Sequence, residues 1–115
     1  MQGIANYVRS VEGILIKIFL DDLRQPFKGF ILVKNYNECI KLLNNDVEVI
    51  SLDHDLGTKK TGYDIALYMV QNNIYPKYIY IHSANPVGAN NIKELINRYK
   101  PDDVEVKIIN YLRYN

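Results

Sequence analysis

The chain has 115 residues, enough for one domain with its own hydrophobic core. With 48% hydrophobic and 23% charged residues and a formal net charge of +1, it has no strong overall attraction to nucleic acid or acidic membranes. The single cysteine, Cys39, cannot form an intramolecular disulfide, and the apolar run at residues 14–20 is too short to span a bilayer. We therefore expect a cytoplasmic protein with no signal peptide and no membrane partner.

Residues 1–13 are weakly patterned and are expected to form an N-terminal arm, followed by a single domain at residues 14–115. Within that domain, segments with the pattern of strands alternate with segments that have the period of helices. Strands are expected at 14–20, 30–33, 47–52, 78–81 and 104–109, and helices at about 36–43, 61–71 and 92–99.

This alternation predicts an α/β fold with a mainly parallel sheet and helices on both faces. Right-handed crossovers make 2-1-3-4-5 the simplest order for five strands, as in flavodoxin-like three-layer folds. The segment between the first two strands, residues 21–29, is shorter than the usual parallel crossover of about a dozen residues. The first helix is therefore expected to be reduced or missing, unless the second strand is placed differently.

Ionisable and polar side chains follow three strands that this order makes adjacent. Because neighbouring strands lie about 4.8 Å apart, these side chains are expected to converge in one crevice. The carboxyl edge of an open α/β sheet is also where such folds bind ligands. The residues are Asp21 and Asp22 after the first strand, Asp53, His54 and Asp55 after the third, and His82, Ser83 and Asn85 after the fourth.

Each of these residues also has a structural explanation when it is taken alone. Aspartates at strand ends often hydrogen-bond loop backbone, and a lone histidine is more often structural than functional. Ser83 can cap a turn, and Asn85 before Pro86 is a turn signal. The joint pattern favours a functional site, because both histidines of the chain lie beside four carboxylates.

Clustered aspartates repel one another, so at neutral pH they need a cation or shifted pKa values. Hard divalent cations prefer oxygen ligands. We expect Asp21, Asp22 and Asp53 to hold Mg²⁺ or Mn²⁺.

The two histidines suit proton transfer at a phosphoester oxygen. We expect His54 and His82 to act as catalytic acid and base, with Asp55 orienting His54.

The remaining polar groups suit phosphate binding. Arg24 is permanently charged and planar, and Ser83 and Asn85 can donate to phosphate oxygens. Residues 86–91 are expected to form a loop before a helix whose amino end favours an anion. Within that loop, Gly88 permits close backbone approach, and Asn90 is a further expected ligand-binding residue.

Four motifs contain or follow these strand ends: LDDLRQP at 20–26, SLDHDLG at 51–57, GYD at 62–64 and HSANPVGANN at 82–91. Together they resemble the cyclic-phosphate processing receiver-like domains, which are derived relatives of response-regulator receivers. The resemblance covers roughly residues 14–98 and implies a receiver-like fold. It also implies that the chain binds or processes a molecule with a cyclic phosphate, in settings linked to RNA repair and ADP-ribose derivatives.

Phosphoacceptor receivers offer a second comparison. Asp53 matches their phosphorylated aspartate, and Ser83 matches the hydroxyl residue after their fourth strand. Those proteins also need a lysine at the end of the fifth strand, usually followed by proline. Here Lys107 lies within the expected strand and no proline follows, which disfavours phosphorelay signalling.

The sequence leaves three functions open. The first is a phosphoesterase that hydrolyses a cyclic phosphate on a small nucleotide-like molecule or an RNA end. The second is a module that binds or sequesters such a ligand without turnover. The third is a receiver phosphorylated on Asp53.

Overall fold

The computed structural model describes residues 15–114, so the expected arm at residues 1–13 lies outside the described residues. No helix within this range combines the length and hydropathy needed to cross a lipid bilayer. The strands are β1 (Ile16–Leu20), β2 (Ile31–Val33), β3 (Val47–Leu52), β4 (Tyr78–Ile81) and β5 (Glu105–Ile108). The helices are α2 (Tyr36–Leu42), α3 (Gly62–Asn72), α4 (Pro86–Tyr99) and α5 (Tyr111–Tyr114).

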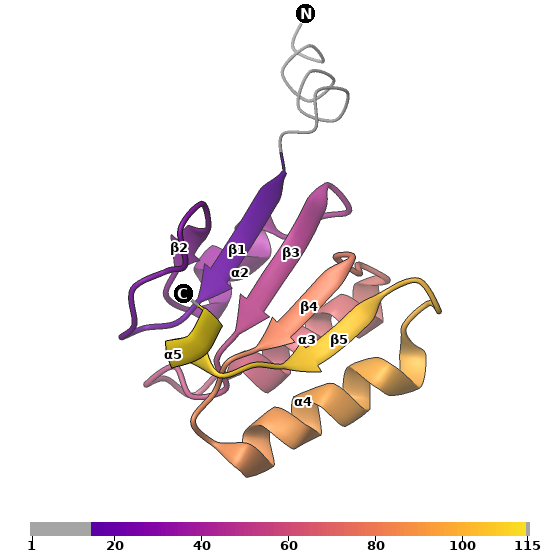
Figure 1. The fold of residues 1–115 in the computed structure, drawn as a ribbon. Helices are drawn as coiled ribbons and strands as arrows, with labels where there is room; N and C mark the ends of the chain where they lie inside the picture. Colours follow the sequence, from indigo (N-terminus) through magenta and orange to yellow (C-terminus); the bar gives the residue numbers. More distant parts are fainter. Residues whose placement is uncertain (1–14, 115) are drawn as a thin grey trace, which may run out of the picture.

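The strands form one sheet in the order β2-β1-β3-β4-β5, with every neighbouring pair parallel, as the sequence predicts (Figure 1). The whole segment between β1 and β2 is described and contains no helix. The expected loss of the first helix is therefore confirmed, and a loop makes the parallel crossover instead.

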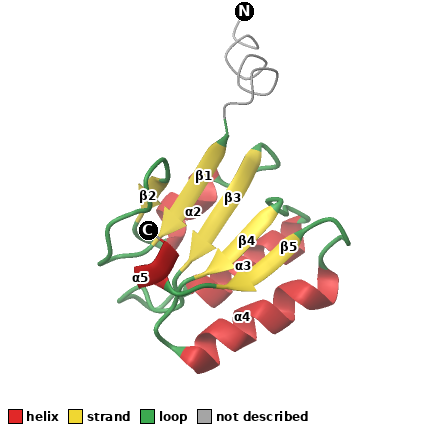
Figure 2. Cartoon of the chain, viewed as in Figure 1, coloured by secondary structure: helices red, strands yellow, loops and turns green. Residues whose placement is uncertain are grey.

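One face of the sheet carries the hydrophobic core. Ile18, Ile50 and Ile79 occupy one register row, and all three are fully buried. Their side chains belong to the same cluster as buried residues from α2, α3 and α4, so these helices cover this face (Figure 2). Complete burial of each isoleucine stabilises the fold by about 1.5–3 kcal/mol.

The opposite face is covered by aromatic side chains and the four-residue helix α5, so the expectation of helices on both faces is wrong for the longer helices α2, α3 and α4, which share one face. Phe19 in β1 lies in register with Ser51 and points to this side. Phe27, from the loop between β1 and β2, packs edge-on against Phe19 with ring centroids 4.9 Å apart. The rings of Tyr111 and Tyr114, from the four-residue helix α5, pack on Phe27 in turn. Phe27 thus replaces part of the missing helix.

Helix α4 begins earlier than the sequence analysis expects. Residues 86–91 are its first turns, so the expected loop there is wrong. The Asn85 side chain caps the helix by accepting from the Gly88 amide, and Pro86 occupies the first turn. Proline suits that position because its fixed φ is helical and its missing N–H has no partner to lose.

The role of Phe27 gives a stability prediction. Phe27→Ala should lower the free energy of unfolding by about 3 kcal/mol, because it removes a ring only 3% exposed from the aromatic cover. Leu23→Ala is the control, since Leu23 lies in the same loop but is 85% exposed and should cost less than about 0.5 kcal/mol. Urea unfolding measures both, and equal effects of the two substitutions would contradict this role.

Candidate functional site

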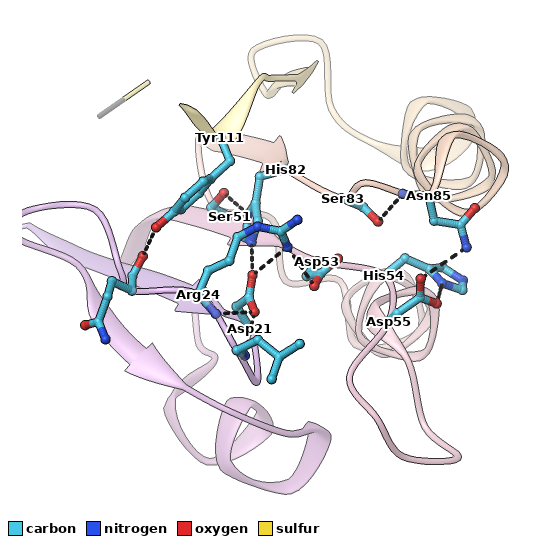
Figure 3. Close-up of polar contacts among 12 residues, drawn as sticks. Asp21, Arg24, Ser51, Asp53, His54, Asp55, His82, Ser83, Asn85 and Tyr111 are labelled. Atoms are coloured by element: carbon cyan, nitrogen blue, oxygen red, sulfur yellow. Dashed lines mark hydrogen bonds and ion pairs between the residues drawn. The ribbon is translucent and has the colours of Figure 1, made fainter. Parts of the chain in front are cut away.

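Asp21 lies directly after β1, and its carboxylate is fully buried and surrounded by donors (Figure 3). Oδ1 accepts from the backbone amides of Leu23 at 2.8 Å and Arg24 at 2.9 Å. Oδ2 accepts from Arg24 Nη1 at 3.3 Å and from His82 Nε2 at 3.0 Å. The carboxylate therefore fixes the loop after β1 and joins it to the end of β4.

His82 is held on both ring nitrogens. Because Nε2 donates to Asp21, Nδ1 accepts from the Ser51 hydroxyl, 2.6 Å away. The ring also stacks on Phe19, with centroids 4.4 Å apart and an interplanar angle of 6°. Its side chain is fully buried. The catalytic role expected for His82 stays a prediction, but these contacts give the ring a positioning role toward Asp21.

These contacts also set the pKa of Asp21. Burial raises the pKa of a carboxyl group, but hydrogen bonds from His82, from the Arg24 and Leu23 amides and from the Arg24 guanidinium outweigh that effect. The pKa of Asp21 is consequently held well below its ordinary value, and the group is a carboxylate at neutral pH.

Asp53, at the carboxyl end of β3, is only 5% exposed and faces the same guanidinium. Arg24 Nη1 lies 3.4 Å from Asp53 Oδ2, so it bridges the two aspartates. Burial and the neighbouring charge of Asp21 raise the pKa of Asp53, although Ser83, His82 and Arg24 partly offset this. The Arg24 side chain also lies over the ring of Tyr111, 5.4 Å from its centroid.

Three of these side chains form a possible metal-ligand set. One donor atom from each of Asp21, Asp53 and His82 lies within 4.8 Å of the others. Asp22, the other ligand expected from the sequence, lies outside this group. Its carboxylate faces the turn at Gly57, where a Cβ would come within 2.9 Å of Asp22 Oδ2.

A second polar cluster lies on the α4 side of the sheet edge. His54 Nδ1 is 2.8 Å from Asp55 Oδ1, and this hydrogen bond lowers the pKa of Asp55. The Asn85 amide donates to the other Asp55 oxygen at 3.4 Å. Because Nδ1 donates to a carboxylate, Nε2 of neutral His54 is an acceptor, and it has no protein partner among the described residues. His54 therefore has the geometry of a general base.

Gly88 positions the His54 ring rather than a ligand. A Cβ at Gly88 would lie 2.5 Å from His54 Cγ, so the bare backbone of α4 lets the imidazole pack against it. Asn90 is exposed in the first turns of α4 and makes no hydrogen bond to the other expected site residues within residues 15–114. The structure thus places Gly88 at the site and leaves the ligand role of Asn90 a prediction.

Ser83 lies between the two clusters (Figure 3). Its Oγ accepts from the backbone N–H of Asn85 at 3.0 Å, and its hydrogen bond to Asp53 lowers the pKa of that carboxyl group. A groove of about 640 Å³ opens at this point and is lined by Arg24, Ser83 and Tyr111, among others. A second cavity, of about 410 Å³, lies between α3 and α4 and shares only His54 with the site.

Two residues of the site are absent from the sequence-based expectations. Ser51 is a buried polar residue two positions before Asp53, in a strand whose one other polar residue is Glu48, and this is the signal that could have identified it. Tyr111 follows the last expected strand and reaches the site through α5. No local motif marks Tyr111, because its position depends on packing against Phe27.

Comparisons with known proteins agree with this arrangement. A family model described as the cyclic-phosphate processing receiver domain matches residues 16–98, most of the chain. No curated protein and no solved structure matches the chain significantly. The matched region includes both polar clusters and ends before β5 and α5.

The lowered pKa of Asp21 predicts a pH-dependent stability. Since the folded-state pKa lies below the ordinary value of 3.8, its contribution is present above that value and is lost as the pH falls toward the folded pKa. We expect Asp21→Asn to lower the free energy of unfolding by about 3 kcal/mol at pH 7 and by clearly less at about pH 3. Urea unfolding at both pH values measures this.

Asp102→Asn provides the control for Asp21→Asn, because it makes the same chemical change at an exposed position after α4. It should change the free energy of unfolding by less than about 0.5 kcal/mol at either pH. An Asp21→Asn effect that is the same at both pH values would show that the buried carboxylate does not supply the linkage.

Proposed function

The chain belongs to the cyclic-phosphate processing receiver family, and on this premise we propose that it binds and hydrolyses a cyclic phosphate on a nucleotide-like molecule. The observation that carries the proposal is that Ser83 lies between the groove that contains Arg24 and the His54–Asp55 pair, whose imidazole lines the neighbouring cavity (Figure 3). Ligands of this class include RNA ends with a cyclic phosphate and ADP-ribose derivatives. We propose the cytoplasm as the location.

The crevice offers suitable donors for a phosphodiester anion. Arg24 uses Nη1 to bridge Asp21 and Asp53, which leaves other guanidinium N–H groups for a phosphate oxygen. The Asn85 side-chain amide, which has a second N–H beside the one given to Asp55, is another donor, and the Ser83 hydroxyl becomes one if it leaves Asp53.

His54 supplies the proton transfer in this proposal. Nε2 accepts a proton from a water molecule whose oxygen attacks phosphorus, and one ring P–O bond breaks. Asp55 holds the imidazole in the required tautomer and stabilises the imidazolium that forms. The leaving oxygen departs opposite the attacking water, where Arg24 stabilises its charge and solvent supplies its proton. The product is a phosphomonoester with a free hydroxyl.

A divalent cation fits the donor set in chemical terms. We propose that Asp21 and Asp53 would hold Mg²⁺ or Mn²⁺, joined by His82 if its Nε2 gives up the hydrogen bond to Asp21, whereas Asp22 faces the turn at Gly57 and its ligand role stays a prediction from the sequence. A bound cation would stabilise negative charge on the phosphate oxygens. Since Arg24 Nη1 already lies between the two buried aspartates, the guanidinium and the metal would compete for one position.

One observation favours the binding module as a second candidate. Both nitrogens of His82 are engaged within the fold, which leaves His54 as the one free imidazole of the site. A domain with one such group suits binding without turnover. The phosphoacceptor receiver is less well supported, because Lys107 pairs with Tyr80 within the sheet and Arg24 is the cation that contacts Asp53.

Phosphorus NMR of adenosine 2′,3′-cyclic phosphate incubated with the protein tests turnover directly. The wild type should convert the cyclic signal to a phosphomonoester signal, and His54→Gln should slow this at least about 100-fold because the base is lost. Asp55→Asn should cause a smaller loss of about tenfold, since it only misorients the imidazole. Unchanged turnover in His54→Gln would remove His54 from the mechanism, and binding without any turnover would favour the binding module.

Competition between Arg24 and a metal is tested by calorimetry with Mn²⁺. Arg24→Gln should tighten Mn²⁺ binding by about tenfold, because two buried aspartates then lack their cation. Asp53→Asn should weaken it by about tenfold, because a ligand oxygen is lost. Thermal unfolding in parallel verifies that both variants are folded. Equal Mn²⁺ affinity in all three proteins would exclude this metal site.

A further inference from the structure

The groove beside Ser83 is lined by both polar and apolar side chains. Its inner end is polar and contains Arg24 and Ser83, the groups to which we assign the phosphate. Its other end is formed by the last residue of β5 and the segment that follows, where the apolar side chains of Ile108, Ile109 and Leu112 line it. A volume of about 640 Å³ lies within the range of about 300–1,000 Å³ that is typical of small-molecule sites.

We propose that this apolar end binds the nucleoside part of the ligand, so that residues 108–112 determine which nucleoside the protein accepts. The inference rests on the proposed function, because it takes the phosphate position from Arg24 and Ser83. It adds a second contact region and a chemical class, a nucleoside cyclic phosphate rather than any small phosphodiester.

Exposed apolar surface is the first argument. Ile108 is 39% exposed and Leu112 is 85% exposed, although both are large hydrophobic side chains at the rim of one groove. A nucleobase that lies against them removes this surface from water, which is favourable. A free inorganic phosphate, by contrast, gains nothing from this wall.

The wall is also rigidly positioned, which lowers the entropic cost of binding. The Tyr111 hydroxyl donates to the Gln25 carbonyl at 2.8 Å, and its ring stacks on Phe27 with centroids 5.5 Å apart. Asn110 caps α5, because its Oδ1 accepts from the Leu112 amide at 3.0 Å. Its Nδ2 makes no hydrogen bond among the described residues, so it can donate to a base or a ribose oxygen.

The experiment compares two probes by calorimetry, both measured in the His54→Gln background so that neither probe turns over. Adenosine 2′,3′-cyclic phosphate carries the nucleoside, and ethylene phosphate has the same five-membered cyclic phosphate without it. We expect the nucleotide to bind at least about tenfold more tightly. The combined change Ile108→Ser and Leu112→Ser should remove most of that difference and leave ethylene phosphate binding unchanged. Leu42→Ser on α2 is the control, since Leu42 is 37% exposed against 39% for Ile108 and lies far from the groove in sequence.

The outcomes separate the two proposals. If both probes bind but the double variant keeps the full preference for the nucleotide, the nucleoside site is wrong while the proposed function stands. If His54→Gln without further changes binds both probes with equal affinity, the nucleoside site is likewise wrong while the proposed function stands. If neither probe binds, the proposed function fails and this inference fails with it.

Discussion

The site depends on the burial of one negative charge. Asp21 is fully buried, and an isolated carboxylate there would be costly. Hydrogen bonds from two loop amides, from Arg24 and from His82 compensate for that cost. The same bonds fix the loop after β1, orient the guanidinium and join the ends of β1 and β4. The carboxylate therefore organises the crevice before any ligand binds.

Arg24 gives this crevice a different electrostatic balance from that of a phosphoacceptor receiver. Such receivers place a lysine at the end of the fifth strand, whereas here Ile108 ends β5 and Lys107 lies within it. Positive charge comes instead from the loop after β1, where Arg24 bridges Asp21 and Asp53. A guanidinium held at this position favours binding of an anionic phosphate over phosphorylation of Asp53 itself. The loop is free to present Arg24 in this way because no helix follows β1, and Phe27 covers the sheet in its place.

The sequence predicts much of this structure because strand ends carry a strong local signal. The alternation of strands and helices gives the order of the sheet, and the polar residues that end neighbouring strands then bring Asp21, Asp53 and His82 together. The sequence predicts side-chain orientation less well, because a side chain that follows a strand can point to either side. Asp22 follows Asp21 directly yet faces the turn at Gly57, and the His82 ring is held between Asp21 and Ser51 with both nitrogens engaged. The start of α4 is misplaced because Asn85 and Pro86 signal a turn and a helix start equally well. Tyr111 depends on tertiary packing alone.

The central claim is that the phosphate binds between Arg24, Ser83 and the His54–Asp55 pair. Amide chemical-shift mapping with adenosine 2′,3′-cyclic phosphate tests it most directly in the full chain. The account predicts that the largest shifts occur at the loop after β1, at residues 53–55 and at residues 83–88, with a second group at residues 108–112. Shifts confined to other surfaces, or none at saturating ligand, would contradict the account.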